Sequence, residues 1–324
     1  MKKFGWHDDR KHVLITCCLI GAMILTSGCG NKAQSKLAPE RPEQTFNEEP
    51  TITLYLHETG ETVSLPLEEY LCGVVAAEMA TDWPGEALAA QAIMARTFTL
   101  EKILAGGVPD RGTDASTDVA EFQAYDATKI NDAVRQAVQE TRGRVVRSDG
   151  QLIKAWFFAD GGGVTAASSK EGLGYDKEPT PYIHSVEDPG EQLADNPNKA
   201  WQAVFPLETV RTALVEMTGR ELAIPTEAAI AEQGPSGRAT KLSFNGYTVS
   251  APALRLALDS TEMKSTLLTN VQINDGTLIM EGKGYGHGVG MSQWGARAMA
   301  EAGRSADEIV HYFFKDVEIT QEYE

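Results

Sequence analysis

Glycine occupies alternate positions from 284 to 290 and returns at 295, within the segment GYGHGVGMSQWG. Because glycine has no Cβ, such a backbone can enter left-handed conformations and can let a ligand or a second backbone segment approach closely. The segment is not a P-loop, since no Lys-Ser/Thr pair follows, and the G-x-G-x-x-G spacing of a dinucleotide site fails. Its donors, acceptors and stacking plane suit a carbohydrate, and they belong to His287, Ser292, Gln293 and Trp294. The alternative is a tight structural loop with a core histidine and tryptophan.

Turn and helix signals divide the rest of the chain into hairpins and short helices. Turn residues separate strand-like stretches at 58–60, 148–150, 245–246 and 275–276. Helix patterns cover 67–79, 86–104, 131–141, 206–218, 251–258, 292–302 and 305–314. We expect Ser64 to cap the first helix and residues 152–158 to return along 144–147. The pattern predicts an α+β fold of mixed helices and antiparallel hairpins that form a substrate cleft, with residues 201–268 as a smaller inserted subdomain.

Residues 1–28 have the pattern of an export signal rather than of a folded element. Four basic residues precede the uncharged run Val13–Gly28, which is shorter than the ~18–20 residues of a comfortable membrane span. The run ends in LTSGC, which resembles a bacterial lipobox and predicts lipidation at Cys29. An uncleaved membrane anchor is the alternative, and both place the protein on the extracytoplasmic face of the cell membrane. Residues 29–50 are predicted to be a flexible linker, and 51–320 the functional domain.

The charge balance limits the partners that the chain can bind. Its 324 residues include 46 Asp and Glu against 29 Lys and Arg, so the formal net charge is −17. A polyanion held by counterion release needs a basic surface, so this balance argues against nucleic acid. Without the signal only two cysteines remain, and acylation of Cys29 would leave Cys72 without a disulfide partner.

Glu78 stands on the apolar face of the first predicted helix, near its C-terminal end. The residues that share this face at helical spacing are Leu67, Leu71, Val74, Val75 and Glu78. An ionised carboxylate there is costly without a partner, and both burial and the negative helix end favour the protonated acid. A carboxylic acid kept neutral in this way can serve as a general acid. The alternative is a structural glutamate that reaches solvent or pairs with Arg96.

The sequence contains no recognisable metal or catalytic-triad motif. Its six histidines are scattered, and no C-x-x-C, H-E-x-x-H or G-x-S-x-G pattern occurs. We therefore expect no metal site and no cofactor. A thiol nucleophile would have to be Cys72, which lies within the first predicted helix and is expected to be packed.

Six segments resemble, in order, the stage II sporulation protein D / amidase enhancer LytB family (SpoIID/LytB). The segments are LEEYLCGVVAAEM (67–79), EALAAQAIMARTFTL (86–100), FQAY (122–125), GGGVT (161–165), PYIHSVED (181–188) and GKGYGHGVGMSQWGARAMAEAGRSADEIVHYFFKDVEI (282–319). They extend over residues 50–320, nearly the whole mature chain, and GHGVGMSQWGA is a highly specific signature.

The resemblance implies a peptidoglycan lytic transglycosylase. In that family a glutamate of the VVAxEM segment is the catalytic acid, which corresponds to Glu78. The reaction cleaves the β-1,4 bond from N-acetylmuramic acid to N-acetylglucosamine, and the muramyl C6 hydroxyl attacks C1 to form a 1,6-anhydro ring. Because the substrate supplies its own nucleophile, one carboxyl group can act as acid and then as base, without the usual second carboxylate.

The same matching implies a set of substrate-binding residues, namely Gln91, Arg96, Gln123, Tyr125, His287, Ser292 and Gln293. For Tyr125, packing is the alternative. One segment departs from the family, because Phe157-Phe158-Ala159-Asp160-Gly161 stands where many members have a Tyr-His-Ser type of segment. No Cys or His lies between Cys72 and His184, so the zinc site of some members is not expected. Asp160 is a candidate to compensate for the changed substrate contacts.

The family also implies a cellular setting and an alternative function. Members in endospore formers act on peptide-stripped glycan strands during engulfment, with stage II sporulation protein P, an amidase, and stage II sporulation protein M, a membrane anchor. Non-sporulating relatives are amidase enhancers or wall-division proteins. The alternative to an enzyme is therefore a non-catalytic glycan-binding enhancer of a cell-wall amidase.

Overall fold

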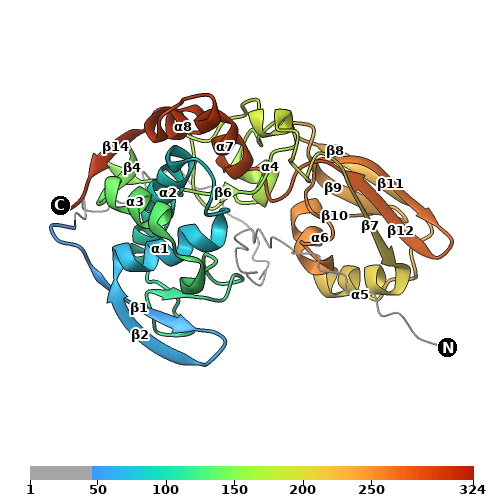
Figure 1. The fold of residues 1–324 in the computed structure, drawn as a ribbon. Helices are drawn as coiled ribbons and strands as arrows, with labels where there is room; N and C mark the ends of the chain where they lie inside the picture. The colour runs from blue at the N-terminus through green and yellow to red at the C-terminus, as the bar shows by residue number, and fades with distance from the viewer. Residues whose placement is uncertain (1–45) are drawn as a thin grey trace, which may run out of the picture.

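The computed structural model describes residues 46–324, so the predicted signal, Cys29 and most of the predicted linker lie outside the described residues. The described chain forms two lobes, each with its own hydrophobic core (Figure 1). We call residues 46–200 together with 283–324 the larger lobe, and residues 201–282 the smaller lobe. Eight α-helices and fourteen short strands, paired mostly antiparallel, confirm the predicted α+β class for this part of the chain.

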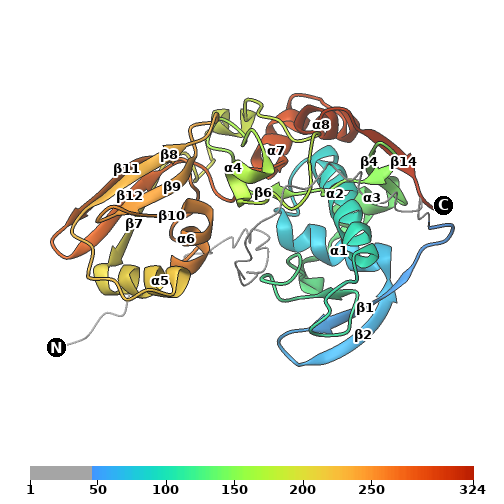
Figure 2. The same cartoon turned by 180° about the vertical axis from the view of Figure 1, so that it is seen from behind.

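Helix α2 (Gly85–Leu104) runs through the larger lobe and is buried from Ala87 to Glu101. Many of its buried residues are alanines, which let neighbouring helices approach closely. It packs against α1 (Leu67–Glu78), α3 (Asp132–Glu140), α7 (Gln293–Glu301) and α8 (Ala306–Phe313). Figure 2 shows from behind that the C-terminal helices α7 and α8 lie beside α2, at the top of the larger lobe in this view. Both ends of the described chain therefore contribute to the larger lobe.

The start of α1 differs from the sequence expectation. The residue before the helix is Pro66, whose position has no side-chain cap. Instead of the expected Ser64, Glu49 bonds the first turn, because its Oε1 accepts the Glu68 N–H at 2.9 Å. Glu49 also pairs with Arg142 at 2.7 Å, so the last residues of the predicted linker contact the lobe. Ahead of the helix stands the predicted hairpin, joined by a parallel strand, as β1 (Thr51–Leu56), β2 (Glu61–Pro66) and β3 (Ala115–Ser116).

The smaller lobe contains two three-stranded sheets, ordered β11-β12-β7 and β10-β9-β8, and two helices. The turns predicted at Asn245 and Asp275 are confirmed, because both residues have positive φ, 46° and 45°, as two-residue hairpin turns require. Strand β12 pairs with β7, so this lobe extends to residue 282, beyond the predicted end at 268. Its elements are β7 (Trp201–Pro206), α5 (Leu207–Thr218), β8 (Ala228–Gln233), β9 (Ala239–Phe244), β10 (Tyr247–Ser250), α6 (Ala251–Leu258), β11 (Leu268–Asn274) and β12 (Thr277–Gly282).

The glycine-rich segment lies in the larger lobe against residues 156–162. Strand β13 (Met291–Ser292) pairs in parallel with β6 (Phe157–Phe158). The expectation that residues 152–158 return along 144–147 is therefore wrong beyond residue 152, because only β5 (Gln151–Leu152) pairs with β4 (Arg144–Ser148). A Cβ at Gly284 would lie 2.6 Å from the Asp160 carbonyl oxygen, and one at Gly290 would collide with the Trp156 carbonyl. The expected close approach of a second backbone is confirmed.

Four further elements complete the described chain. They are the 3₁₀ turns η1 (Ala127–Lys129) and η2 (Pro189–Gln192), helix α4 (Ser169–Leu173) and strand β14 (Glu318–Gln321), which pairs with β4. Between residues 46 and 324, none of the helices combines the length and the apolar character that crossing a membrane requires.

Candidate active site

Glu78 is the last residue of α1 and is 1% exposed. Its Oε1 accepts the backbone N–H of Ala124 at 3.0 Å, and its Oε2 accepts Nε2 of Gln293 at 3.3 Å. The carboxyl group is therefore enclosed where the end of α1, the 122–125 segment and the start of α7 meet. It neither points into open water nor depends on Arg96 for a partner, so it differs from both structural alternatives considered for this residue.

Gln91 and Gln293 complete a buried polar cluster with Glu78. Gln91, on α2, is fully buried, and its Oε1 lies 3.5 Å from Nε2 of Gln293. Among the described residues, Nε2 of Gln91 has no hydrogen-bond partner although it is buried. An unpaired buried amide costs free energy, and such groups concentrate at sites that bind a ligand or water. Three sequence-predicted site residues are thus brought together from three different helices.

Ser292 positions Gln293 of this cluster by capping α7. Its Oγ accepts the N–H of Gly295 at 3.1 Å, which caps α7 and begins the helix at Gln293. Ser292 is fully buried, and its hydroxyl also hydrogen-bonds to Asp188. The side chain therefore fixes where Gln293 stands and which way α7 leaves the glycine-rich segment.

The structure places Gln123 and Tyr125 on either side of Ala124. Gln123 donates to Oγ1 of Thr99 at 2.8 Å, while its buried Oε1 has no partner within the described chain. Tyr125 stacks on Tyr70 of α1, with ring centroids 5.7 Å apart, and burial raises the pKa of its phenol. This packing against α1 is the alternative expected for Tyr125. Together the two side chains hold the Ala124 amide in place against Glu78.

His287 is 5% exposed and packs against Phe158, with ring centroids 5.6 Å apart. Its Nδ1 accepts the Val289 N–H at 3.1 Å. Burial, with a smaller contribution from Arg255, lowers the pKa of His287 to about 3. The imidazole is therefore neutral at physiological pH, which suits a structural or hydrogen-bonding role better than proton transfer.

Arg96 lies elsewhere. It is fully buried, and it donates to both carboxylate oxygens of Glu68, from Nε at 2.8 Å and from Nη2 at 2.6 Å. Glu68 also accepts the hydroxyl of Tyr323 at 2.6 Å. Since Glu68 and Glu78 are ten residues apart on α1, about 15 Å along its axis, the structure does not bring Arg96 to the Glu78 cluster.

Two buried aspartates near the cluster were not predicted as a pair. Asp188 accepts the N–H groups of Gly161 at 2.6 Å and Gly190 at 3.0 Å, and burial raises its pKa. Asp160 accepts Nδ2 of Asn196 at 2.6 Å, and burial together with Asp188 raises its pKa to about 6. Asp188 ends a segment that carries the family resemblance and Asp160 lies in the segment that departs from it, but only the fold shows that the two lie together beside the glycine-rich segment.

The backbone N–H of Ala124, which donates to Glu78, is a further part of the site that the amino-acid sequence could not reveal. A backbone donor has no side-chain signature, and only the FQAY motif marked the place.

Phe157 and Phe158, which replace the usual family residues, are each 1% exposed. They contribute packing rather than polar contacts to the neighbourhood of His287.

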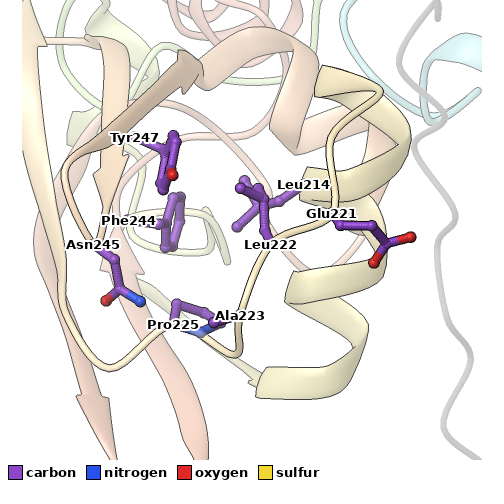
Figure 3. Close-up of a pocket in the computed structure, with 8 residues that line it drawn as sticks. All are labelled: Leu214, Glu221, Leu222, Ala223, Pro225, Phe244, Asn245 and Tyr247. Atoms are coloured by element: carbon purple, nitrogen blue, oxygen red, sulfur yellow. The ribbon is translucent and has the colours of Figure 1, made fainter.

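The remaining groups offer little other chemistry. Burial raises the pKa of the Cys72 thiol to about 11, so it is a packed thiol rather than a nucleophile, as expected. Within residues 46–324, no three His, Cys, Asp or Glu side chains converge in a way that would ligate a metal ion. A pocket of about 120 Å³ lies in the smaller lobe and contains none of the predicted site residues (Figure 3). Its lining includes Leu214, Leu222, Phe244 and Tyr247.

Comparison with known proteins places this arrangement in a family. A family model described as stage II sporulation protein (SpoIID) matches residues 55–147, which include Glu78, Gln91 and Gln123. The chain is 30% identical over 297 residues to stage II sporulation protein D of Bacillus amyloliquefaciens, covering 86% of this chain and 81% of the relative. It is 28% identical to stage II sporulation protein D of Bacillus subtilis, covering 84% and 79%.

A third relative carries another name. The amidase enhancer of Bacillus subtilis is 29% identical over 296 residues, which cover 77% of this chain and 40% of that protein. Identity at this level over most of the chain, together with the family-model match that includes α1 and α2, shows that the chain belongs to the SpoIID family, which includes stage II sporulation protein D and the amidase enhancer.

Proposed function

We propose that this protein is a peptidoglycan lytic transglycosylase that acts on the cell wall in sporulation, with Glu78 as its catalytic acid and base. The observation that carries the proposal is the enclosure of the Glu78 carboxyl group between the Ala124 amide and Gln293. A carboxyl group held in one orientation and kept from water has two of the properties that general acid catalysis uses.

The chemistry needs only this one carboxyl group. The protonated Glu78 gives its proton to the glycosidic oxygen as the bond from muramyl C1 breaks. The resulting carboxylate then takes the proton of the muramyl C6 hydroxyl while that oxygen bonds to C1, so no water is consumed and the acid is regenerated. Such a route avoids the second carboxylate of ordinary glycosidases. Among the residues around Glu78, the partners Gln91 and Gln293 are amides that can orient a sugar but carry no charge.

The test is digestion of peptide-free glycan strands by the purified protein, with mass analysis of the new chain ends. We expect 1,6-anhydromuramyl ends from the unaltered protein and none from Glu78→Gln. The matched control is Glu69→Gln, because Glu69 is an exposed residue of the same helix that pairs with Arg135 on the surface. Anhydro products from a folded Glu78→Gln protein would refute the assignment.

A second candidate function is a non-catalytic glycan-binding enhancer of a cell-wall amidase. It is favoured by the 1% exposure of Glu78, since an acid must reach its substrate, and by the relative named amidase enhancer. This candidate predicts saturable glycan binding and stimulation of an amidase that Glu78→Gln leaves unchanged, with no anhydro ends. The two assays together separate the candidates.

The cellular setting is part of the proposal. We propose that Cys29 is acylated, or that residues 1–28 remain as an anchor, so that the body faces the wall. Stage II sporulation protein P, an amidase that strips stem peptides, and protein M, a membrane anchor, are the proposed partners. Membrane fractionation of Cys29→Ala distinguishes the modes, because loss of membrane association indicates a lipid anchor and its retention indicates a membrane span.

A further inference from the structure

A cluster of two tryptophans and an arginine adjoins the Glu78 cluster and is not explained by the acid–base chemistry. Trp83 lies in the loop between α1 and α2, five residues after Glu78, and Trp294 directly follows Gln293. Their rings meet edge to face, with centroids 5.0 Å apart and an angle of 69° between the planes. Figures 1 and 2 both place α7, which carries Trp294, beside α2.

Arg297 joins the two rings. Its guanidinium carbon lies 5.3 Å from the Trp83 centroid and 5.0 Å from the Trp294 centroid, so it contacts both by cation–π interactions. The guanidinium also pairs with Asp195 and with Glu301, each at 2.8 Å. With two carboxylates on one cation, the cluster carries no excess positive charge. An anionic ligand is therefore disfavoured here, and an uncharged one fits better.

Trp294 adds an unsatisfied donor. It is 5% exposed, and its Nε1–H is buried without a hydrogen-bond partner among the described residues. An indole N–H in a buried position normally finds a partner, so one is missing here. Trp83 is only partly buried, so its ring is the reachable part of the cluster. The ring of Trp83 therefore provides a face on which an uncharged ligand can stack, while the Trp294 donor beside it is covered by protein.

We propose that Trp83, supported by Arg297 and Trp294, forms a subsite that binds an uncharged N-acetylglucosamine residue next to the bond presented to Glu78. A pyranose shows a face of C–H groups with slight positive charge, which suits the negative face of an indole. This inference deepens the proposed glycan function and rests on it for the sugar class.

The experiment measures binding apart from cleavage. The full-length protein carrying Glu78→Gln, solubilised in detergent, is titrated with chitotetraose, an uncharged oligomer of N-acetylglucosamine, and binding is followed by calorimetry and tryptophan fluorescence. We expect saturable binding, a Kd about tenfold higher on adding Trp83→Ala, and a smaller rise with Trp83→Phe, which keeps a ring. The matched control, Trp201→Phe, changes a tryptophan in the core of the smaller lobe and should leave the Kd unchanged.

Two results would overturn the subsite. The first is the absence of saturable chitotetraose binding by the Glu78→Gln protein. The second is a Trp83→Ala protein that keeps its thermal midpoint and binds chitotetraose within twofold of its parent. Failure of the transglycosylase proposal would look different, since anhydro ends would be missing from the unaltered protein while the Trp83-dependent binding remained.

Discussion

Arg96 and Glu68 form a buried, bidentate ion pair, and Glu68 also accepts a hydrogen bond from the hydroxyl of Tyr323 near the C-terminus. The pair joins α1, α2 and the end of the chain inside the larger lobe. A buried charge that loses its partner is strongly destabilising, because the remaining ion is desolvated and uncompensated. Arg96 is therefore a structural residue, and replacing it should weaken glycan binding only by destabilising the fold.

We predict that Arg96→Met lowers the free energy of unfolding by about 3–5 kcal/mol. Arg135→Met is the matched control, because Arg135 pairs with Glu69 on the surface, and the loss there should stay below about 1 kcal/mol. Urea denaturation followed by circular dichroism measures both. A stable Arg96→Met protein that no longer binds glycan would instead assign Arg96 to the substrate site.

His287 and Asp160 should give the stability opposite dependences on pH. The folded-state pKa of His287 is lowered from 6.5 to about 3, so between these values only the unfolded chain binds the proton and stability falls as pH falls. The folded-state pKa of Asp160 is raised from 3.8 to about 6, so in that window only the folded chain keeps the proton and stability falls as pH rises.

Single variants separate the two opposing effects. Relative to the unaltered protein, Asp160→Asn should gain about 2 kcal/mol of stability as the pH rises from 4 to 7, because the cost of ionising Asp160 is removed. His287→Gln should lose the steep decline of stability below pH 6.5. Urea unfolding at half-unit pH steps measures the slopes. Exposed Asp110→Asn is the control, and equal slopes for it and Asp160→Asn would contradict the assignment.

At the scale of elements, the contact between β13 and β6 decides whether the glycine-rich segment reaches Glu78. Gly290 precedes β13 with φ of +82°, and a Cβ there would collide with the Trp156 carbonyl just before β6. Gly303, after α7, has a similar φ of +84° but open space around its Cα. The two glycines share a φ near +80° and differ in their surroundings, because a Cβ at Gly290 would meet both the Trp156 carbonyl and the Phe314 ring, whereas one at Gly303 would meet nothing within 4 Å.

We therefore predict unequal costs for the same substitution. Gly303→Ala should lower the free energy of unfolding by about 1–2 kcal/mol, the cost of a left-handed alanine. Gly290→Ala adds a backbone collision and should cost about 4 kcal/mol or more, with loss of glycan cleavage. Thermal denaturation of both variants measures the difference. Similar midpoints for the two would show that β13 can shift away from β6 without loss.

On the scale of the whole molecule, the two lobes have separate hydrophobic cores and are joined by buried polar contacts. Arg238 of the smaller lobe is fully buried and donates to the Gly161 carbonyl at 2.8 Å. Beside it, the hydroxyl and N–H of Ser236 donate to Glu171 of the larger lobe at 2.8 and 2.9 Å. Burial lowers the pKa of Arg238 to about 10, so it stays charged at neutral pH.

This arrangement predicts that Arg238 couples the unfolding of the lobes. Calorimetry of the unaltered protein should show one cooperative transition, whereas Arg238→Met should show two, because each core can then melt separately. The control is Arg211→Met, since Arg211 pairs with Glu208 on the surface of the smaller lobe. A single transition at an unchanged temperature in Arg238→Met would show that the lobes are coupled by other contacts.

Local features of the chain were predictable from sequence. The hairpin turns at Asn245-Gly246 and Asp275-Gly276, the helix from 67 to 78 and the backbone approach around Gly290 all follow from conformational preferences acting within a few residues. Glu78 was identifiable because a carboxylate on an apolar helix face breaks the pattern. The motif resemblance, rather than spacing, linked it to Gln293, 215 positions later.

Partner choice among buried polar groups was decided only by the tertiary structure. Pairing with Arg96 was the alternative expected for Glu78, whereas Arg96 is bonded to Glu68. Ala124 contributes a backbone amide that no residue type reveals, and Asp188 collects donors from segments that the sequence keeps apart. A buried charge or amide must be satisfied by whatever group packing brings within about 3 Å, and packing depends on all the surrounding segments at once. Sequence thus determined most of the elements and singled out the carboxyl group of Glu78, while the fold decided which groups surround it.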